Sequence, residues 1–299
     1  MKKIPHIIRS MRLRTLPLSA AGVTLGLLLA YAAGYGYWMV TLLTLLTTIS
    51  LQILSNICNE LGDYQAGTDV DERHGPANSL QRGDLTVDDF RKMIRVMAAL
   101  CAIFGVLLVC AASPTLISWK PLALLAAGGC AIWAAMHYTL GKHPYGYRGL
   151  GDIFVFIFFG LVSVLGGYFV AANTLNWWLL LPASAIGFFS VAVLNVNNIR
   201  DMETDVNTRV TIPLKIGERA AKIYHTVLIV GGWIMLIVYI IACGHSIWNW
   251  LPLIVAPLYA QHLKGVWRNS GTALDPMLPL LVISTFVLAV VMGVSSLLG

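Results

Sequence analysis

The sequence has few charged residues: only 11% of its 299 residues are Asp, Glu, Lys or Arg, against roughly 25% in soluble domains. It has no Cys-x-x-Cys pair, and its five cysteines lie far apart in apolar stretches. It also lacks a phosphate-binding glycine loop, a dinucleotide-binding motif and a Ser-His-Asp pattern, and its histidines show no metal-ligand spacing. These absences argue against a soluble domain, a cysteine-based metal or redox centre, and the common nucleotide-dependent enzymes.

Long apolar stretches make up most of the chain, since 58% of its residues are hydrophobic. A transmembrane helix needs roughly 20 mostly apolar residues. Nine stretches are candidates for such helices: 16–35, 37–58, 96–113, 121–140, 153–172, 177–199, 223–243, 246–261 and 277–298. No Ser/Gly-rich linker separates them. The sequence therefore predicts an all-α integral membrane bundle of nine transmembrane helices around a central cavity, built as a single domain over residues 1–299.

The basic residues predict the orientation of this bundle. All of the 20 Lys and Arg residues except Lys120 lie before the first stretch or in the loops after the second, fourth, sixth and eighth. Lys and Arg in short loops stay on the cytoplasmic side of a membrane. We therefore expect a cytoplasmic N-terminus, cytoplasmic polar loops and an external C-terminus. Because the positive charge is spread evenly over these loops, it indicates orientation rather than a nucleic-acid partner.

Two similar polar motifs follow the second and the sixth stretch. The first is Asn59-x-x-x-Asp63, and the second is Asn197-x-x-x-Asp201. Because the motifs are four predicted helices apart, they indicate two pseudo-repeated halves, with the second and sixth helices facing each other across the cavity. Further carboxylates and amides lie close to both motifs, namely Asn56, Asp69, Asp71, Asn195, Asn198, Glu203 and Asp205.

These oxygen-bearing side chains suit a divalent cation. Asp201 and Asp205 are four residues apart, and like charges at this spacing repel on a helix by a few tenths of a kcal/mol, whereas a bound cation reverses the effect. Mg²⁺ prefers such oxygen ligands and is often shared with substrate phosphates. The alternative is a solvated loop whose acids only balance nearby arginines, but an amide such as Asn56 near the end of a membrane helix is costly without a partner.

Basic and hydroxyl groups on the same side could bind the phosphate oxygens that a metal leaves unsatisfied. Tyr138 and Lys142 are the strongest pair, because i, i+4 spacing at the end of a helix directs both side chains to one place. The full set of candidates is Arg73, Arg82, Tyr138, Lys142, Tyr147, Arg148, Arg200 and Lys215.

With these motifs the chain resembles the UbiA-type intramembrane aromatic prenyltransferases, whose members have nine helices around a cavity and Mg²⁺ between two Asp-rich motifs. The second motif fits as Asn197-Asn198-Ile-Arg200-Asp201-x-x-x-Asp205. In the first motif the interval from Asp63 to Asp69 is longer than usual. This longer interval resembles the first motif of the family's 1,4-dihydroxy-2-naphthoate branch. Two further segments resemble the same branch, namely Arg12-Leu-Arg14-Thr15-Leu16-Pro17 and Tyr145-Gly-Tyr147-Arg148-Gly149-Leu-Gly151-Asp152.

The resemblance implies transfer of a polyprenyl group from polyprenyl diphosphate to 1,4-dihydroxy-2-naphthoate, with loss of CO₂ and diphosphate, in a bacterial cytoplasmic (inner) membrane. It implies that Mg²⁺ is held by the catalytic residues Asp63, Asp69, Asp201 and Asp205, together with Asn59. It implies that the substrates are bound by Asn59, Arg73, Arg82, Tyr138, Lys142, Tyr147, Arg148, Asn197, Asn198 and Arg200. The family's usual Gly-Lys-x-Thr is replaced here by Asn207-Thr208-Arg209-Val-Thr211, so the resemblance does not assign the cation at this place.

Two alternatives stay open at this point. Within the same class of enzyme, the acceptor could be another aromatic ring, such as 4-hydroxybenzoate or a chlorophyll- or haem-like ring. In a different class, the chain could be a transporter or a divalent-cation channel. Transporters place ionisable groups near the middle of the bilayer, whereas the nine apolar stretches contain no Asp, Glu, Lys or Arg. This distribution favours chemistry at one membrane surface.

Overall fold

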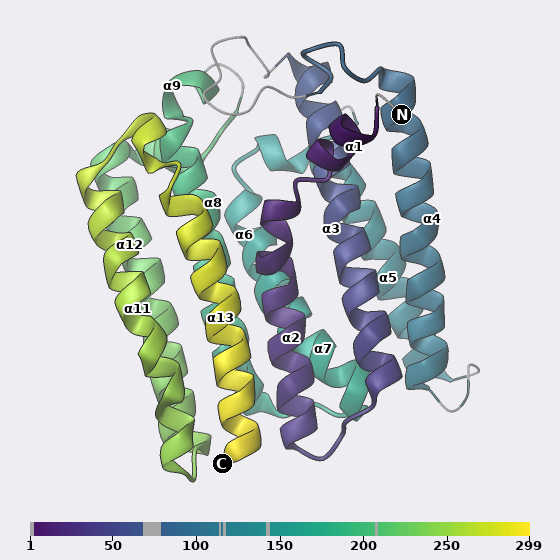
Figure 1. Cartoon of the computed structure of the whole chain (residues 1–299), viewed down its shortest axis with the longest axis vertical. Coiled ribbons are helices and arrows are strands. Elements are labelled where there is room, and N and C mark those ends of the chain that lie inside the picture. The colour runs from purple at the N-terminus through teal and green to yellow at the C-terminus, as the bar shows by residue number, and fades with distance from the viewer. Residues whose placement is uncertain (1–2, 68–78, 114, 116–117, 142–143, 207–208) are drawn as a thin grey trace.

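A computed structural model describes residues 3–67, 79–113, 115, 118–141, 144–206 and 209–299. Long helices run side by side in a bundle (Figure 1). Apart from one isolated parallel bridge between Arg148 and Val210, the regular secondary structure of the described residues is helical. The predicted all-α class is therefore confirmed.

The helical elements follow one another along the chain as α1 (Ile4–Ser10), η1 (Leu13–Thr15), α2 (Leu16–Ala32), α3 (Trp38–Ala66), α4 (Val87–Ala112), α5 (Trp119–His137), η2 (Tyr145–Tyr147), α6 (Gly151–Val155), η3 (Phe156–Val162), α7 (Ser163–Ala172), η4 (Trp177–Leu179), α8 (Leu180–Arg200), α9 (Met202–Asp205), α10 (Ile212–Ile216), α11 (Glu218–Cys243), η5 (Ile247–Val255), α12 (Ala256–Arg268), η6 (Gly271–Leu274) and α13 (Met277–Leu298). The segment η3 is a π-helix, and it joins α6 to α7 without a break in the helical path.

Eight helical segments of the described chain are long and apolar enough to cross a membrane. The remaining predicted span, residues 246–261, falls on η5 and α12 rather than on one regular helix. Pro252 lies inside η5, and proline lacks the amide hydrogen that a regular α-helix needs. Buried His225 of α11 and His262 of α12 share a hydrogen bond, with their Nε2 atoms 2.9 Å apart. The count of nine spanning helices and the two repeated halves stay predictions.

Glycines allow the central helices to approach closely. A Cβ atom on Gly160 of η3 would lie 2.5 Å from the Cα atom of Gly187 in α8, and one on Gly26 of α2 would lie 2.2 Å from the carbonyl oxygen of Val164 in α7. Neither place leaves room for a side chain. Small residues have this role in membrane helices, where close backbone contact replaces the hydrophobic effect as the cause of association. The glycines thus fix α2 against α7 and η3 against α8.

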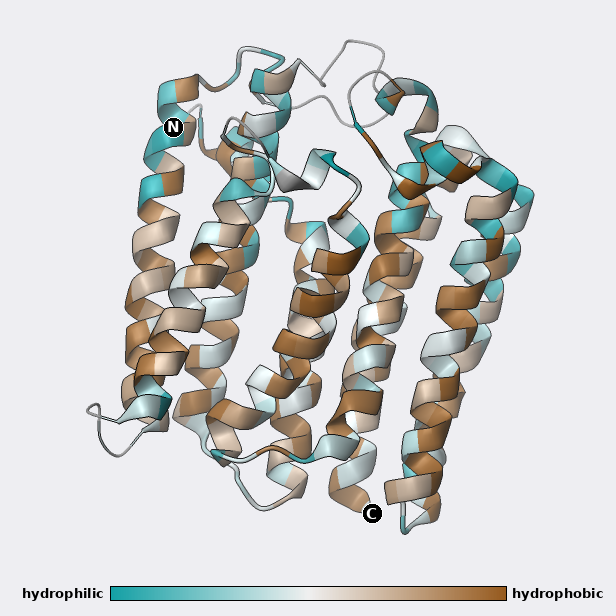
Figure 2. Ribbon diagram, turned by 180° about the vertical axis from the view of Figure 1, so that it is seen from behind, coloured by the Kyte–Doolittle hydropathy of each residue, from teal (hydrophilic) through white to brown (hydrophobic). Residues whose placement is uncertain are grey.

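Polar residues gather mainly at one end of the bundle, which is the end at which the N-terminus lies (Figure 2). The middles of the long helices are mostly apolar in the same view. The C-terminus lies at the opposite end (Figure 1). The C-terminal ends of α3 and α8 are both at the polar end, so the motif residues on these two helices are on the same side of the molecule.

Helix α3 continues beyond its apolar part. The sequence predicted an apolar span to residue 58, but the helix runs to Ala66 and ends at Gly67, which has φ +66°. Asn59 and Asp63 therefore lie on the last turns of a helix rather than in a loop. Glycine adopts this left-handed conformation without strain and commonly ends helices. The next helix, α4, likewise begins before its apolar stretch of residues 96–113, at a capping box that Thr86 and Asp89 form around its first turn.

Candidate active site

A cavity of about 530 Å³ opens at the polar end of the bundle. Its walls come from the N-terminal segment, the end of α3, the segment after α5 and the end of α8. Residues of both polar motifs line it: Asn59 and Asp63 from α3, and Asn197, Asn198 and Arg200 from α8. The two helices that carry the motifs thus face one shared cavity.

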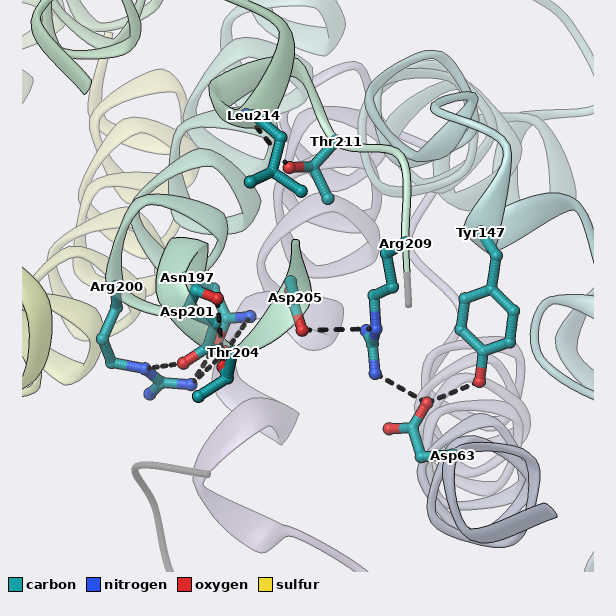
Figure 3. Close-up of polar contacts among 10 residues, drawn as sticks. All are labelled: Asp63, Tyr147, Asn197, Arg200, Asp201, Thr204, Asp205, Arg209, Thr211 and Leu214. Atoms are coloured by element: carbon teal, nitrogen blue, oxygen red, sulfur yellow. Dashed lines mark hydrogen bonds and ion pairs between the residues drawn. The ribbon is translucent and has the colours of Figure 1, made fainter. Parts of the chain in front are cut away.

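The carboxylate of Asp63 is buried, with the residue 2% exposed. Its Oδ1 atom accepts a hydrogen bond from the Tyr147 hydroxyl at 2.7 Å and another from Nη2 of Arg209 at 2.7 Å (Figure 3). The Arg209 guanidinium also lies over the Tyr147 ring, with 5.2 Å between its Cζ atom and the ring centroid. These contacts place one carboxylate, one phenol and one guanidinium in a fixed group at the cavity.

Arg209 also connects the two motifs. Its Nε atom lies 3.7 Å from Oδ1 of Asp205, which is 1% exposed. Its position follows from the backbone on both sides: the Arg209 amide donates to the Asp205 carbonyl at 3.1 Å, and the Val210 amide donates to the Tyr147 carbonyl at 3.1 Å. A single guanidinium therefore lies between two buried carboxylates from opposite walls. The resemblance left the cation at this place unassigned, and the structure places Arg209 there.

Asp201 has a different environment. Arg200 binds its carboxylate in a bidentate manner, with Nε 2.7 Å from Oδ1 and Nη2 2.7 Å from Oδ2 (Figure 3). The side-chain amide of Asn197 donates to Oδ2 at 3.3 Å, and Asn197 accepts from Arg200 at 3.0 Å. Asp275 adds an ion pair to Arg200 at 3.0 Å. Bidentate pairs of this kind are strong and directional, so Asp201 and Arg200 form a rigid buried unit beside the cavity.

A tight contact positions Asn59. The Thr139 hydroxyl lies 3.1 Å from Oδ1 of Asn59 and 3.0 Å from the carbonyl oxygen of Cys58, and either oxygen can accept its hydrogen. A Cβ atom on Gly62 would lie only 2.6 Å from the Cβ atom of Thr139. The absence of a side chain at residue 62 therefore lets Thr139 reach the helix that carries Asn59 and Asp63.

Tyr138 lines the cavity next to Thr139, at the residue that follows α5. Burial raises the pKa of Tyr138 to about 12, because low polarity disfavours the charged phenolate. The helix ends at His137, and Gly141 has φ +106°, so the helical i, i+4 argument that linked Tyr138 to Lys142 was wrong. The sequence had placed apolar residues up to 140 in one helix, but hydropathy alone does not locate a helix end.

The predicted site residues have different positions in the structure. Asp69, Arg73 and Lys142 lie outside the described residues. Tyr147 contacts Asp63, as described above. Arg82 and Arg148 are exposed, and they are not among the described residues that line the cavity. Their proposed contacts with substrate stay predictions.

Several residues that line the cavity were not in the predicted site. Arg12 lies there in a left-handed conformation with φ +48°, and Glu60 is 2% exposed with Oε1 accepting from the Ser79 amide at 2.7 Å. Asp152 of α6 lines the cavity and accepts from the Tyr224 hydroxyl at 2.9 Å. Arg12 and Asp152 could have been found from the sequence, because they belong to the segments that carry the family resemblance, whereas Glu60 stands at a position that the first motif leaves open.

The oxygen atoms at the cavity have the chemistry that Mg²⁺ requires. Among the described residues, no group of three or more His, Cys, Asp or Glu side chains is arranged to hold a metal by itself. Mg²⁺ usually takes one or two protein carboxylates and completes its shell with water and substrate phosphates. Asp63, Asn59 and Asn197, which line the cavity, provide such a partial set of oxygen donors, and the carboxylate of Asp205 lies close by, 3.7 Å from Nε of Arg209. The donors therefore fit a Mg²⁺ ion that is shared with a phosphate substrate.

A second cavity of about 410 Å³ adjoins the first. Asn59 and Tyr138 line both cavities. Most of the second cavity is walled by apolar residues from the middle of the bundle, including Leu108, Phe158 and Val170. The polar cavity and the apolar cavity thus adjoin each other at Asn59 and Tyr138.

The structure combines an all-helical membrane bundle, a cavity with acidic and arginine residues at one surface, and an adjoining apolar cavity. These features define a class of intramembrane enzyme that acts on a substrate with an anionic head group and an apolar tail. Residues 19–278 match the model of the UbiA prenyltransferase family. The chain belongs to this family.

Relatives and solved structures agree with this assignment. The chain is 40% identical over 273 residues to the 1,4-dihydroxy-2-naphthoate octaprenyltransferase of Escherichia coli (strain K12), covering 91% of this chain and 88% of that protein. It is 34% identical over 298 residues to the Haemophilus influenzae protein of the same name, covering 96% and 94%. The fold is similar to that of a UbiA homolog from Aeropyrum pernix K1, with TM-score 0.67, 13% identity and 97% of each chain covered. A UbiA homolog from Archaeoglobus fulgidus bound to GPP and Mg²⁺ gives TM-score 0.62 at 19% identity, covering 96% of this chain and 100% of that one.

Proposed function

We propose that this chain transfers a polyprenyl group from polyprenyl diphosphate to 1,4-dihydroxy-2-naphthoate, releasing diphosphate and CO₂ and giving demethylmenaquinol. The polar and apolar cavities that meet at Asn59 and Tyr138 carry the proposal, because they provide a place for the diphosphate and an adjoining place for the isoprenoid chain. The names of the Escherichia coli and Haemophilus influenzae relatives support the choice of acceptor.

The diphosphate binds at the polar cavity. Asp63 and Asp205, with Asn59, Asn197 and Asp201, are the described residues that would hold Mg²⁺, and Asp69 is the further ligand that the sequence predicts. Bound there, the ion would neutralise charge on the diphosphate and so make it a better leaving group. Arg12 and Arg209 provide guanidinium groups for phosphate oxygens, which such groups can bind through paired hydrogen bonds. Arg200, which is held by Asp201 and Asp275, adds positive charge at the same cavity.

The transfer itself takes place at the junction of the cavities. The carbon–oxygen bond of the allylic diphosphate breaks, and its electron pair leaves with the diphosphate. The electron-rich ring carbon that carries the carboxylate then bonds to the allylic carbon. CO₂ leaves from the same ring carbon, and the electrons of that bond restore the aromatic ring. The apolar walls keep water away from the allylic cation, and Tyr138 stays a neutral hydroxyl because burial raises its pKa to about 12.

An assay with the purified protein tests the proposal. The protein is incubated with a polyprenyl diphosphate and either 1,4-dihydroxy-2-naphthoate or 4-hydroxybenzoate, with and without Mg²⁺, and the products are identified by mass spectrometry. A Mg²⁺-dependent, decarboxylated prenyl-naphthoquinol is the expected product. Product from 4-hydroxybenzoate alone would show that the acceptor is a different aromatic ring. No product from either acceptor would favour the transporter alternative instead.

The cytoplasmic placement of the polar end follows from the positive charge of its loops. We expect reporter enzymes fused to the two termini in an inner-membrane host to give opposite signals, with the N-terminal fusion cytoplasmic. Matching signals from both fusions would contradict the proposed orientation.

A further inference from the structure

The Arg209 guanidinium contacts the carboxylate oxygen atoms that a divalent ion would need as ligands. Its Nη2 atom is 2.7 Å from Oδ1 of Asp63, and its Nε atom is 3.7 Å from Oδ1 of Asp205. All three side chains are largely buried, with exposed fractions of 15% for Arg209, 3% for Asp63 and 2% for Asp205. The guanidinium and a metal ion bound by these two carboxylates would therefore compete for the same place (Figure 3).

Buried charges make this competition strong. A buried carboxylate that loses its cation is strongly unfavourable, and so is a buried guanidinium that loses its anion. A divalent ion entering alone would satisfy Asp63 and Asp205 but would leave Arg209 without these two carboxylates. A diphosphate entering with the ion would offer Arg209 a new anion, since guanidinium groups bind phosphate in the same paired geometry as carboxylate.

Backbone hydrogen bonds hold the amides of Arg209 and Val210, so the exchange needs a movement of the Arg209 side chain only. The Arg209 amide donates to the Asp205 carbonyl, and the next amide, that of Val210, donates to the Tyr147 carbonyl, each at 3.1 Å. The Tyr147 ring lies beneath the guanidinium at 5.2 Å and gives it an aromatic surface over which to move.

We propose that Arg209 couples metal binding to diphosphate binding: without diphosphate its guanidinium holds Asp63 and Asp205 against the entry of a divalent ion, and when diphosphate binds, it turns to the phosphate oxygens and leaves both carboxylates to the ion. The inference rests on the proposed function, in that a prenyl diphosphate is the ligand. It makes Arg209 the residue that prevents the site from holding a metal ion without substrate.

The test measures Mn²⁺ binding to the detergent-purified, full-length protein in the absence of any diphosphate, by the loss of the free-ion signal in electron paramagnetic resonance. Arg209→Gln should bind Mn²⁺ with a dissociation constant at least about tenfold lower than the wild type, a change equivalent to 1.4 kcal/mol. Arg219→Gln is the matched control, because it removes the same charge from an exposed residue at the same end of the bundle and should bind Mn²⁺ as the wild type does.

A second variant and a second measurement keep the test decisive. Arg209→Lys retains the charge and should stay within about threefold of the wild-type dissociation constant, a difference of less than 0.7 kcal/mol. If Arg209→Gln does not fold, Arg209→Met, which also removes the charge, takes its place with the same expected tightening. In turnover, Arg209→Gln should show a lower KM for Mg²⁺ and a higher KM for the prenyl diphosphate. Equal Mn²⁺ affinities of Arg209→Gln and wild type, or a tightening shared by Arg219→Gln, would overturn the inference.

The two proposals fail separately. If the wild type makes the prenylated naphthoquinol but Arg209→Gln leaves Mn²⁺ binding unchanged, the coupling is wrong and the function stands. If the wild type makes no product from either acceptor, the function is wrong, whatever the Mn²⁺ titrations give.

Discussion

Gly62 is the position at which a single added methyl group should disturb the active site most selectively. Its place on α3 faces Thr139, and a Cβ atom there would lie 2.6 Å from both the Cβ atom and the carbonyl oxygen of Thr139 and 2.7 Å from its hydroxyl oxygen. Thr139 in turn contacts Asn59 and the carbonyl of Cys58 through that hydroxyl. We therefore expect Gly62→Ala to push the segment after α5 away from α3.

The expected cost is the balance of three effects. Overpacking of this kind costs about 1–3 kcal/mol, and loss of the Thr139 hydrogen bond costs roughly 0.5–1.5 kcal/mol. Alanine within a helix recovers up to about 1 kcal/mol relative to glycine. The net destabilisation is then roughly 0.5–4.5 kcal/mol. The rate of prenyl transfer should also fall in the folded protein, because Asn59 and Asp63 lie on the same turns of α3 as Gly62.

Gly105→Ala provides the comparison. Gly105 lies inside α4, and a Cβ atom there would meet no atom within 4 Å, so this variant should be neutral or slightly stabilised. Thermal unfolding in detergent and prenyl transfer by the same preparations measure both effects. If Gly62→Ala unfolds at the same temperature as Gly105→Ala and retains full turnover, the steric reasoning is wrong.

Three other predictions follow from the contacts described above. Asp201→Asn leaves Arg200 buried without its bidentate carboxylate and should cost about 3–5 kcal/mol, whereas Asp275→Asn removes a half-exposed partner and should cost less than about 1 kcal/mol; similar unfolding temperatures for the two would contradict this. His262→Leu removes the hydrogen bond between α11 and α12 and should cost about 0.6–2 kcal/mol without a change in the KM of either substrate, and a raised KM would refute a purely structural role. Because burial raises the pKa of Tyr138 to about 12, its hydroxyl stays neutral below about pH 11; Tyr138→Phe should therefore keep the shape of the wild-type pH–rate profile, and a lost alkaline inflection would show that the phenol titrates.

Much of the fold could be predicted from hydropathy, because it is a local property. The apolar stretches predicted the eight segments that are long enough to span a membrane. The end of α3 could not be predicted in this way. The helix continues through Asp63, whose carboxylate is paired with Arg209, a partner that lies 146 residues further along the chain.

The candidate site shows the same limit. The repeated Asn-x-x-x-Asp pattern was sufficient to predict that Asn59 and Asn197 would face one cavity, since it depends only on helix position. The pairing of Tyr138 with Lys142 assumed that a helix continued past residue 138, and the helix ends at His137. The importance of Arg209 depends on a contact between the segment after α9 and the segment after α5, which no local pattern encodes.

The contact between Asp63 and Arg209 has a consequence for the order in which the protein is made. The two residues are 146 positions apart, and a ribosome adds roughly 5–20 residues per second. Asp63 therefore exists for about 7–30 seconds before its arginine is synthesised. During this time the Asp63 carboxylate lacks this guanidinium, and a buried carboxylate without a cation is strongly unfavourable. The carboxylate must therefore stay in contact with water, take up a proton or bind a cation from solution. The first half of the bundle is thus inserted with an unfinished polar end, and synthesis of the segment after α9 completes it.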